Sequence, residues 1–322
     1  MLTLFLFKQH FIIPKKYTDQ NMPEVDDSKI LKIGDVLNNP DRPLKERFRA
    51  LFTLKNIGGA TAIDCIKKAF DDPSALLKHE LAYCLGQMQD HLAIPILKDV
   101  LRDKNEHPMV RHEAAEGLGA IGKDHVLPLL KEFANDEAVP VAETCQLAIR
   151  RIEWVRSGNE GGKDDFFGSV DPTPASEERN LCSLREKLLS ESTDLYERYR
   201  ALFALRNINS KESTKILSEG LKYGGALFRH ELAFVLGQIQ EPIAVDALIQ
   251  GLEDKSQDEM VRHECAEALG AIATEKAMKV LEGFLEDEIR VVRESCEIAL
   301  DMCEYENSTE LQYANTLELV DS

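Results

Sequence analysis

The chain lacks the features that mark secreted, membrane-spanning and nucleic-acid-binding proteins. Its seven cysteines form no CxxC pair and no dense framework, and an odd number favours reduced thiols and a cytoplasmic protein. The apolar stretch from Leu2 to Phe7 is too short to span a bilayer, and it lacks the basic start and the cleavage site of a signal peptide. We therefore expect neither export nor a membrane partner.

Basic residues are also in short supply. The chain has 39 Lys and Arg against 57 Asp and Glu, which gives a net charge of −18. Binding to phosphates requires a basic surface, so we expect no nucleic-acid partner. An acidic surface attracts basic proteins, although the same charge can simply keep a protein soluble.

Strand-like alternation is scarce, and helical spacing takes its place. Apolar residues recur every three or four positions in a chain that is 43% hydrophobic and 30% charged. Arg47–Phe52 reappears as Arg198–Phe203, and Met109–Ile121 reappears as Met260–Ile272, each 151 residues later. Within each half, a period of about 31–33 residues occurs four times. The pattern predicts an all-α solenoid of eight helical-hairpin repeats, arranged as two duplicated four-repeat halves.

The duplication and the sequence between its copies define five expected segments. These are an N-terminal extension outside the fold at 1–22, repeat halves at 23–156 and 181–305, an acidic linker rich in Gly and Pro at 157–180, and a loose C-terminal tail at 306–322.

The strongest functional signal is a His-Glu dipeptide that occurs four times, always in the two middle repeats of a half. The step is 33 residues within each half and 151 between halves, and the pairs contain four of the eight histidines. The pairs are His79-Glu80, His112-Glu113, His230-Glu231 and His263-Glu264. Stacked repeats would place the two pairs of each half side by side, and facing halves would close a site for two metal ions. Imidazole and carboxylate ligands without cysteine suit iron or manganese better than zinc.

Two further observations concern the helices that carry these pairs. None of the four completes an HExxH motif, because positions 83, 116, 234 and 267 hold Tyr, Glu, Phe and Glu. The helix face of each histidine continues with Ala and Gly: Ala82 and Gly86, Ala115 and Gly119, Ala233 and Gly237, Ala266 and Gly270. Such glycines cost about 1 kcal/mol each relative to Ala. They either leave room for metal, dioxygen and substrate or allow close helix–helix contact, and the sequence leaves both open.

Four segments carry a resemblance to a known family: Leu77–Gln89, Pro108–Glu113, Phe228–Glu231 and Met260–Gly270. They resemble the deoxyhypusine hydroxylases, and the similarity runs from about Val25 to Leu317. The resemblance implies a HEAT-repeat monooxygenase with two Fe ions, Fe²⁺ in the reduced state, and dioxygen as co-substrate. It implies that the substrate is the deoxyhypusine side chain of eukaryotic translation initiation factor 5A, that the product is hypusine, and that an unidentified electron donor takes part.

The resemblance also implies roles for the eight residues. The implied iron ligands are His79, His112 and Glu113 in one half, and His230, His263 and Glu264 in the other. Glu80 and Glu231 are either further ligands or catalytic-site groups that bind the cationic substrate. We favour the second role, because consecutive residues on a helix diverge by about 100°. Two other classes remain open, namely a non-catalytic HEAT-repeat scaffold for a basic protein and a dinuclear zinc or manganese hydrolase.

Overall fold

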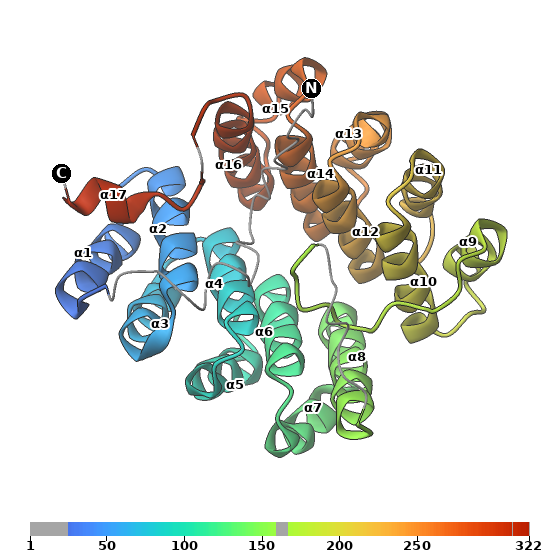
Figure 1. Cartoon of the computed structure of the whole chain (residues 1–322), viewed down its shortest axis with the longest axis horizontal. Helices are drawn as coiled ribbons and strands as arrows, with labels where there is room; N and C mark the ends of the chain where they lie inside the picture. The colour runs from blue at the N-terminus through green and yellow to red at the C-terminus, as the bar shows by residue number, and fades with distance from the viewer. Residues whose placement is uncertain (1–24, 159–166, 311, 322) are drawn as a thin grey trace, which may run out of the picture.

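The computed structural model describes residues 25–158, 167–310 and 312–321 (Figure 1). The N-terminal extension expected at 1–22 lies outside the described residues. All regular structure in the described part is helical, without a strand, which confirms the all-α prediction. No described helix is long and apolar enough to cross a membrane.

Consecutive helices pair into hairpins that follow one another along the chain, with one helix of each pair outside and one inside (Figure 1). The outer helices are α1 (Asp27–Asn38), α3 (Gly59–Lys68), α5 (Ile94–Arg102), α7 (Leu127–Phe133), α9 (Leu181–Leu189), α11 (Lys211–Gly220), α13 (Val245–Glu253) and α15 (Glu275–Glu282). The inner helices are α2 (Leu44–Ile57), α4 (Ala75–Gln87), α6 (Pro108–Ile121), α8 (Val139–Arg156), α10 (Leu195–Ile208), α12 (Ala226–Ile239), α14 (Glu259–Ile272) and α16 (Arg290–Glu306). A short helix, α17 (Thr316–Asp321), follows, and 3-10 turns at Ala69–Asp71, His91–Ala93, Asp124–Val126 and Pro242–Ala244 join several elements.

The inner helices begin and end at residues with clear local signals. The hydroxyl of Ser74 accepts a hydrogen bond from the backbone N–H of Leu77 at 3.0 Å and caps α4. Pro108 occupies the first turn of α6, where a missing N–H costs nothing. Gly122 ends α6 in the left-handed conformation at φ 71°. The signals at Ser74 and Pro108 fix where α4 and α6 start, and so where the fifth residue of each lies.

Buried arginines join neighbouring hairpins. The guanidinium of Arg111 donates to the carbonyl of Leu101 at 3.2 Å and to the carboxylate of Asp136 at 2.7 Å. Arg262 makes the corresponding ion pair with Asp287 at 2.6 Å. Because both partners are buried, the charges compensate each other and the hairpins are held in one register.

The glycines on the histidine faces serve helix–helix contact. A Cβ at Gly86 would lie 2.5 Å from the Cα of Gly117, and a Cβ at Gly270 would lie 2.7 Å from the Cα of Ala299. A Cβ at Gly119 would lie 2.8 Å from the Cβ of Ala148, and a Cβ at Gly237 would lie 3.1 Å from the Cα of Ala268. Of the two explanations that the sequence left open, close backbone approach accounts for these positions.

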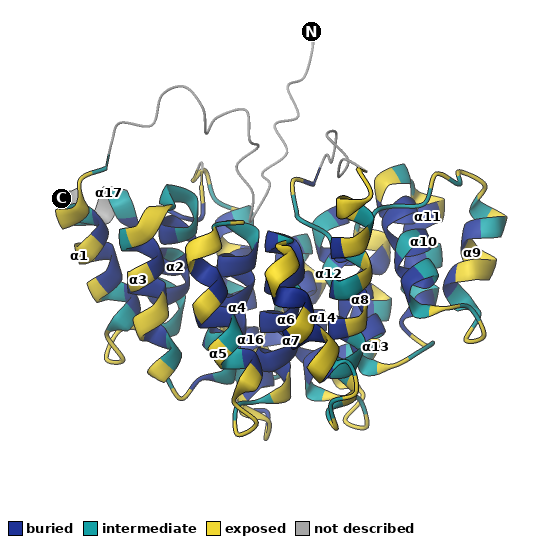
Figure 2. Cartoon of the chain, turned by 90° about the horizontal axis from the view of Figure 1, so that it is seen from below, coloured by how far each residue is buried: buried dark blue, intermediate teal, exposed yellow. Residues whose placement is uncertain are grey.

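The two halves contact each other at both ends, so that the inner helices surround a common centre (Figure 1). Helix α16 packs against α2 and α4, and α8 packs against α12. At the first of these seams the guanidinium of Arg49 donates to both carboxylate oxygens of Asp301, at 3.0 and 3.1 Å. In Figure 2 buried residues line the contacts between helices, and exposed residues lie on the outer surface.

The segment after Tyr305 is packed, which corrects the expectation of a loose tail. The ring of Tyr313 lies 6.3 Å from that of Phe52 and 5.6 Å from that of Tyr305. The guanidinium of Arg49 lies 4.7 Å from the Tyr313 ring centre. Helix α17 packs on α1 and α2. The Tyr313 ring, with the Arg49 guanidinium over it, anchors this segment. Sequence periodicity cannot predict such a contact.

The described part of the linker touches both halves. The carboxylate of Asp171 accepts hydrogen bonds from Arg206 at 2.6 and 2.8 Å, and its backbone carbonyl accepts one from Arg151 at 2.8 Å. The backbone N–H of Val170 donates to the side-chain oxygen of Gln87 at 2.9 Å. This part of the linker therefore lies fixed against the inner helices.

Candidate metal site

The four histidines of the His-Glu pairs meet at the centre of the molecule. Each is the fifth residue of its inner helix: His79 on α4, His112 on α6, His230 on α12 and His263 on α14. Their ring centres lie 5.2–5.7 Å apart, both within halves (His79–His112, His230–His263) and between them (His79–His230, His79–His263, His112–His230). All four side chains are buried. The repeats thus stack as the spacing predicts, and the halves bring their pairs together.

Most of the imidazole nitrogens make no hydrogen bond. His79 Nδ1 lies 3.1 Å from a carboxylate oxygen of Glu80, whereas His79 Nε2 and both nitrogens of the other three rings are buried without a hydrogen bond. Leaving a buried polar atom unsatisfied costs about 1–3 kcal/mol. A group of such atoms that converges on one point fits a cation, which would accept their lone pairs.

Carboxylates surround the rings. A carboxylate oxygen of Glu113 lies 3.4 Å from His79 Nε2, and one of Glu264 lies 3.3 Å from His230 Nε2. All four glutamates of the pairs are buried, at 4–5% exposure. Carboxylate oxygens next to imidazole nitrogens form a donor set that divalent transition metals bind.

Three sets of side chains bring their ligand atoms within 4.8 Å of one another and could hold a metal ion: His79, His112 and Glu113; His79, His230 and His263; and His263, Glu264 and Glu267. The first is the set that the resemblance implies for the first half. In the second half the third member of the set is Glu267, beside His263 and Glu264, whereas the resemblance implies His230 as the third ligand. The second set takes histidines from both halves.

Glu267 and its counterpart Glu116 line the same cavity but were absent from the site predicted by sequence. Each follows a paired histidine by four residues and so lies on the same helix face. The signal was present at the positions where the HExxH motif failed. On an inward-facing helix, a carboxylate one turn beyond the histidine indicates the site as clearly as the carboxylate next to the histidine does.

Burial and crowding set the protonation of the cluster. Burial, followed by the neighbouring imidazoles, holds the pKa of His112 and of His263 well below the ordinary value, so both rings are neutral. Burial also acts on His79, but the carboxylates of Glu113 and Glu80 outweigh it and raise the pKa of that ring. Burial and nearby carboxylates raise the pKa of Glu231 well above its usual range. Without a cation, Glu231 therefore binds a proton more readily than a free carboxyl group does, and a bound cation would relieve the same repulsion.

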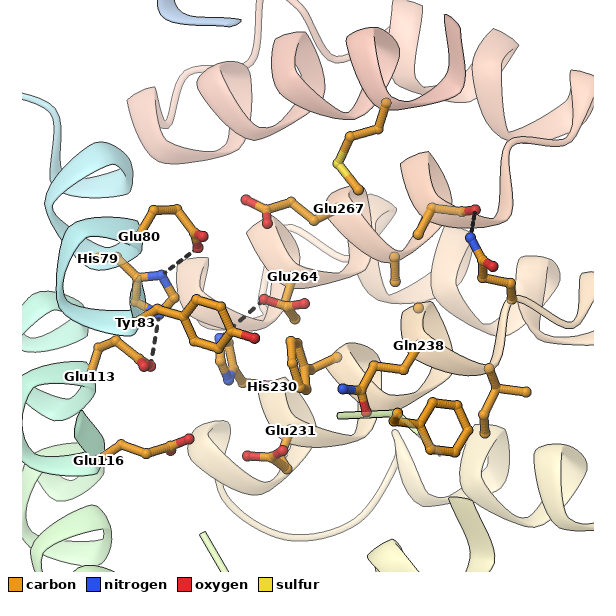
Figure 3. A pocket seen from close by; sticks show the side chains of 18 of the residues that line it. His79, Glu80, Tyr83, Glu113, Glu116, His230, Glu231, Gln238, Glu264 and Glu267 are labelled. Atoms are coloured by element: carbon orange, nitrogen blue, oxygen red, sulfur yellow. Dashed lines mark hydrogen bonds and ion pairs between the residues drawn. The ribbon is translucent and has the colours of Figure 1, made fainter. Parts of the chain in front are cut away.

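The cluster opens into a cavity of about 110 Å³ (Figure 3). Its lining combines carboxylates with Tyr83, Phe234, Phe167 of the linker, and Gln238. Tyr83 and Phe234 are equivalent positions, 151 residues apart, and their ring centres lie 6.1 Å from each other beside the histidines. The Tyr83 hydroxyl is buried and has no hydrogen-bond partner. The cavity thus joins an acidic end to an aromatic wall, which suits a long cationic chain.

Paired helices in a closed array, with a buried cluster of histidines and glutamates at its centre, define the chain as a HEAT-repeat protein with a candidate metal site. The family described as HEAT repeats matches residues 30–107 and 224–301, and the PBS lyase HEAT-like repeat matches residues 110–136.

Several proteins similar to this chain are named deoxyhypusine hydroxylase. Deoxyhypusine hydroxylase of Drosophila melanogaster is 57% identical over 299 residues, covering 92% of this chain and 99% of that protein. The Homo sapiens protein of the same name is 55% identical over 295 residues, covering 91% and 97%. The structure of human deoxyhypusine hydroxylase in complex with glycerol superposes with a TM-score of 0.85 at 56% identity, covering 87% of this chain and 97% of that chain. The chain belongs to the deoxyhypusine hydroxylase family, as the sequence motifs indicate.

Proposed function

We propose that the chain is an iron- and dioxygen-dependent monooxygenase that hydroxylates the deoxyhypusine side chain of eukaryotic translation initiation factor 5A and yields hypusine. The observation that carries the proposal is the cluster of four buried histidines in a chain of this family, because most of their ring nitrogens make no hydrogen bond. An adventitious cluster would have no reason to leave so many buried atoms unsatisfied.

The proposed ligands of two Fe ions are the six that the resemblance implies, namely His79, His112, Glu113, His230, His263 and Glu264. Glu267 is a further candidate. Bound Fe²⁺ would supply electrons to dioxygen and the oxidising power that an unactivated CH₂ group requires. Insertion of one oxygen atom needs two further electrons from an external reductant. Because each half contributes two histidines, we propose that neither half, 23–156 or 181–305, forms the site alone.

The side chains of the cavity would hold the substrate. Deoxyhypusine is a lysine extended by an aminobutyl arm, so it is long and positively charged. Buried carboxylates attract its amines, and the rings of Tyr83 and Phe234 would pack against its methylene groups and exclude water. An acidic chain also attracts a basic partner protein.

Metal analysis and turnover test this proposal together. We expect stoichiometric iron, visible absorption that changes on exposure to air, and hydroxylation of the factor carrying deoxyhypusine but not of the factor carrying lysine. Replacing His112 or His263 with Ala should remove iron and turnover while the helical content stays, since apolar contacts elsewhere hold the fold. A metal-free protein that binds a basic partner would indicate a scaffold. A colourless zinc protein would indicate a hydrolase.

A further inference from the structure

The centre of the molecule is closed on the side where the inner helices begin. At the N-terminal ends of α6 and α14, His107 Nε2 lies 2.9 Å from a carboxylate oxygen of Glu259, so the two halves touch directly there. Met109 and Met260, the second residues of the same helices, are each 2% exposed and belong to one apolar cluster. The paired histidines are fifth residues and lie about one turn from this closed side. The way to the histidines is therefore from the C-terminal ends of the inner helices.

The lining of the cavity extends in that direction, but along the second half only. On α12 it runs from His230 to Gln240, a step of ten residues (240 − 230) that spans about 15 Å along the helix axis. The outer part of the lining consists of Asn209, Gln238, Ile239 and Gln240. Their counterparts 151 residues earlier are Gly58, Gln87, Met88 and Gln89, and in the described part of the chain none of these lines the cavity. The duplication alone would make both sides equivalent, so a segment outside the repeats must set the difference.

That segment is the linker, which two equivalent glutamines hold at the entrance. The side chain of Gln87 accepts a hydrogen bond from the backbone N–H of Val170 at 2.9 Å and donates one to its carbonyl at 3.4 Å. Gln238, 151 residues later, donates to the hydroxyl oxygen of Ser169 at 3.1 Å. Each glutamine follows a paired histidine by eight residues (87 − 79 and 238 − 230), so both lie about two helical turns beyond the cluster. One short stretch of linker thus joins the two halves at the open side.

The linker also places an aromatic ring in the cavity wall. Phe167 lines the cavity at 6% exposure, and the guanidinium of Arg206 lies 4.7 Å from its ring centre. Arg206 is itself held by the carboxylate of Asp171 at 2.6 Å and by the side-chain oxygen of Gln238 at 3.0 Å. Because Phe167 belongs to the linker and not to a repeat, the duplication supplies no second ring of this kind.

We propose that the linker segment Phe167–Asp171 forms one wall of the entrance to the cavity, and that Phe167 is a specificity-determining residue. Its ring would pack against the methylene groups of the substrate side chain that lie nearest the substrate's backbone. An apolar ring suits methylene groups and excludes water from the charged groups beyond it. The metal cluster lies deeper, so the ring and the cluster contact different parts of one chain. This inference rests on the proposed function for the identity of the substrate.

Truncating the ring tests the inference with two probes that differ in those methylene groups. One probe is a peptide with one deoxyhypusine, and the other is butane-1,4-diamine, which represents only the far end of the chain. Phe167→Ala should weaken peptide binding about tenfold, as expected for the loss of about two buried methylene contacts. Diamine binding should change by less than about twofold, because the diamine does not extend to the ring. Phe167→Leu keeps an apolar side chain and should return the peptide affinity to within about threefold of the parent.

Phe284→Ala is the matched control. The Phe284 ring lies 5.8 Å from the Arg262 guanidinium, much as Phe167 lies against Arg206, but Phe284 does not line the cavity. Its removal should leave both affinities within about twofold of the parent. In turnover, Phe167→Ala should raise KM for the peptide about tenfold and leave kcat and iron content within about twofold, since the lost contact is equal in the ground state and the transition state.

The outcomes keep the two proposals apart. The inference is overturned if Phe167→Ala binds the peptide within about twofold of the parent, if peptide and diamine binding fall equally, or if Phe284→Ala reproduces the loss. Equal losses of both probes would mean that the whole cavity has changed shape. If the parent binds a lysine peptide as tightly as the deoxyhypusine peptide, and both depend on Phe167, the proposed function fails and the entrance wall stands.

Discussion

A single methyl group added between α4 and α6 should disturb both the fold and the metal site. A Cβ at Gly86 would lie 2.5 Å from the Cα of Gly117, a backbone atom that cannot rotate away. Because carbon atoms pack at about 3.5–4.0 Å, the two helices would have to separate by about 1 Å. These helices carry His79 and His112, whose ring centres lie 5.5 Å apart, so the separation reaches the ligands directly.

The expected cost of Gly86→Ala follows from two opposing effects. Overpacking a tight contact costs about 1–3 kcal/mol and sometimes more, and a backbone contact as short as this belongs at the upper end. Alanine returns about 1 kcal/mol through its better helix propensity. We therefore expect a loss of about 2 kcal/mol in the free energy of unfolding, accompanied by a clear drop in bound iron.

Guanidinium unfolding and iron analysis on the same preparation measure both effects. The control is Gly225→Ser at the N-cap of α12, where a new Cβ would lie 3.6 Å from a carboxylate oxygen of Glu143. Ser74 holds the equivalent position and donates to Glu294 at 2.7 Å, so the control should cost nothing measurable. If Gly86→Ala keeps full iron and unfolds within about 0.5 kcal/mol of the parent, the reasoning about helix spacing is wrong.

Three further predictions concern acid stability, the seam and the two halves. The hydrogen bond from Arg262 lowers the pKa of Asp287, so the stabilisation is present above about pH 4 and is lost as the pH falls through the lowered pKa. Unfolding of Asp287→Asn should therefore depend less on pH below about 4 than unfolding of the parent, and equal slopes would contradict this. Arg49→Met leaves the buried Asp301 without its main partner and should lower the free energy of unfolding by about 2–4 kcal/mol. An unchanged free energy of unfolding would mean that this contact between α2 and α16 does not stabilise the fold. A fragment of residues 1–156 should bind no pair of iron ions, and two ions per fragment would contradict the shared site.

The parts of the structure that could be predicted are those encoded by spacing. The repeat period fixes the hairpins, and the 33- and 151-residue steps place His79, His112, His230 and His263 at one phase of stacked helices. Once the helices pack, those rings must meet. Glu116 and Glu267 follow the same spacing one helical turn later, so the sequence contains their signal at the positions that break the HExxH motif.

Other contacts could not be derived from spacing because each depends on one side chain meeting a distant one. Tyr313 packs against Phe52 across most of the chain length, and Asp171 meets Arg206 from a segment without periodicity. The role of Gly86 depends on the neighbouring helix, because a small residue leaves room for a ligand or for a helix with equal ease. Only the position of Gly117 decides between them.

Closure of the array of helical hairpins changes how the protein unfolds. In an open solenoid the terminal repeats have one neighbour each and fray first, so unfolding proceeds inward one repeat at a time. Here α16 and α17 pack on α2, and α8 packs on α12, so the first and last hairpins shield each other. Detaching any one of them breaks contacts on two sides, which favours a single all-or-none transition over stepwise melting. The histidine cluster, which draws on both halves, would then persist intact until the whole chain unfolds.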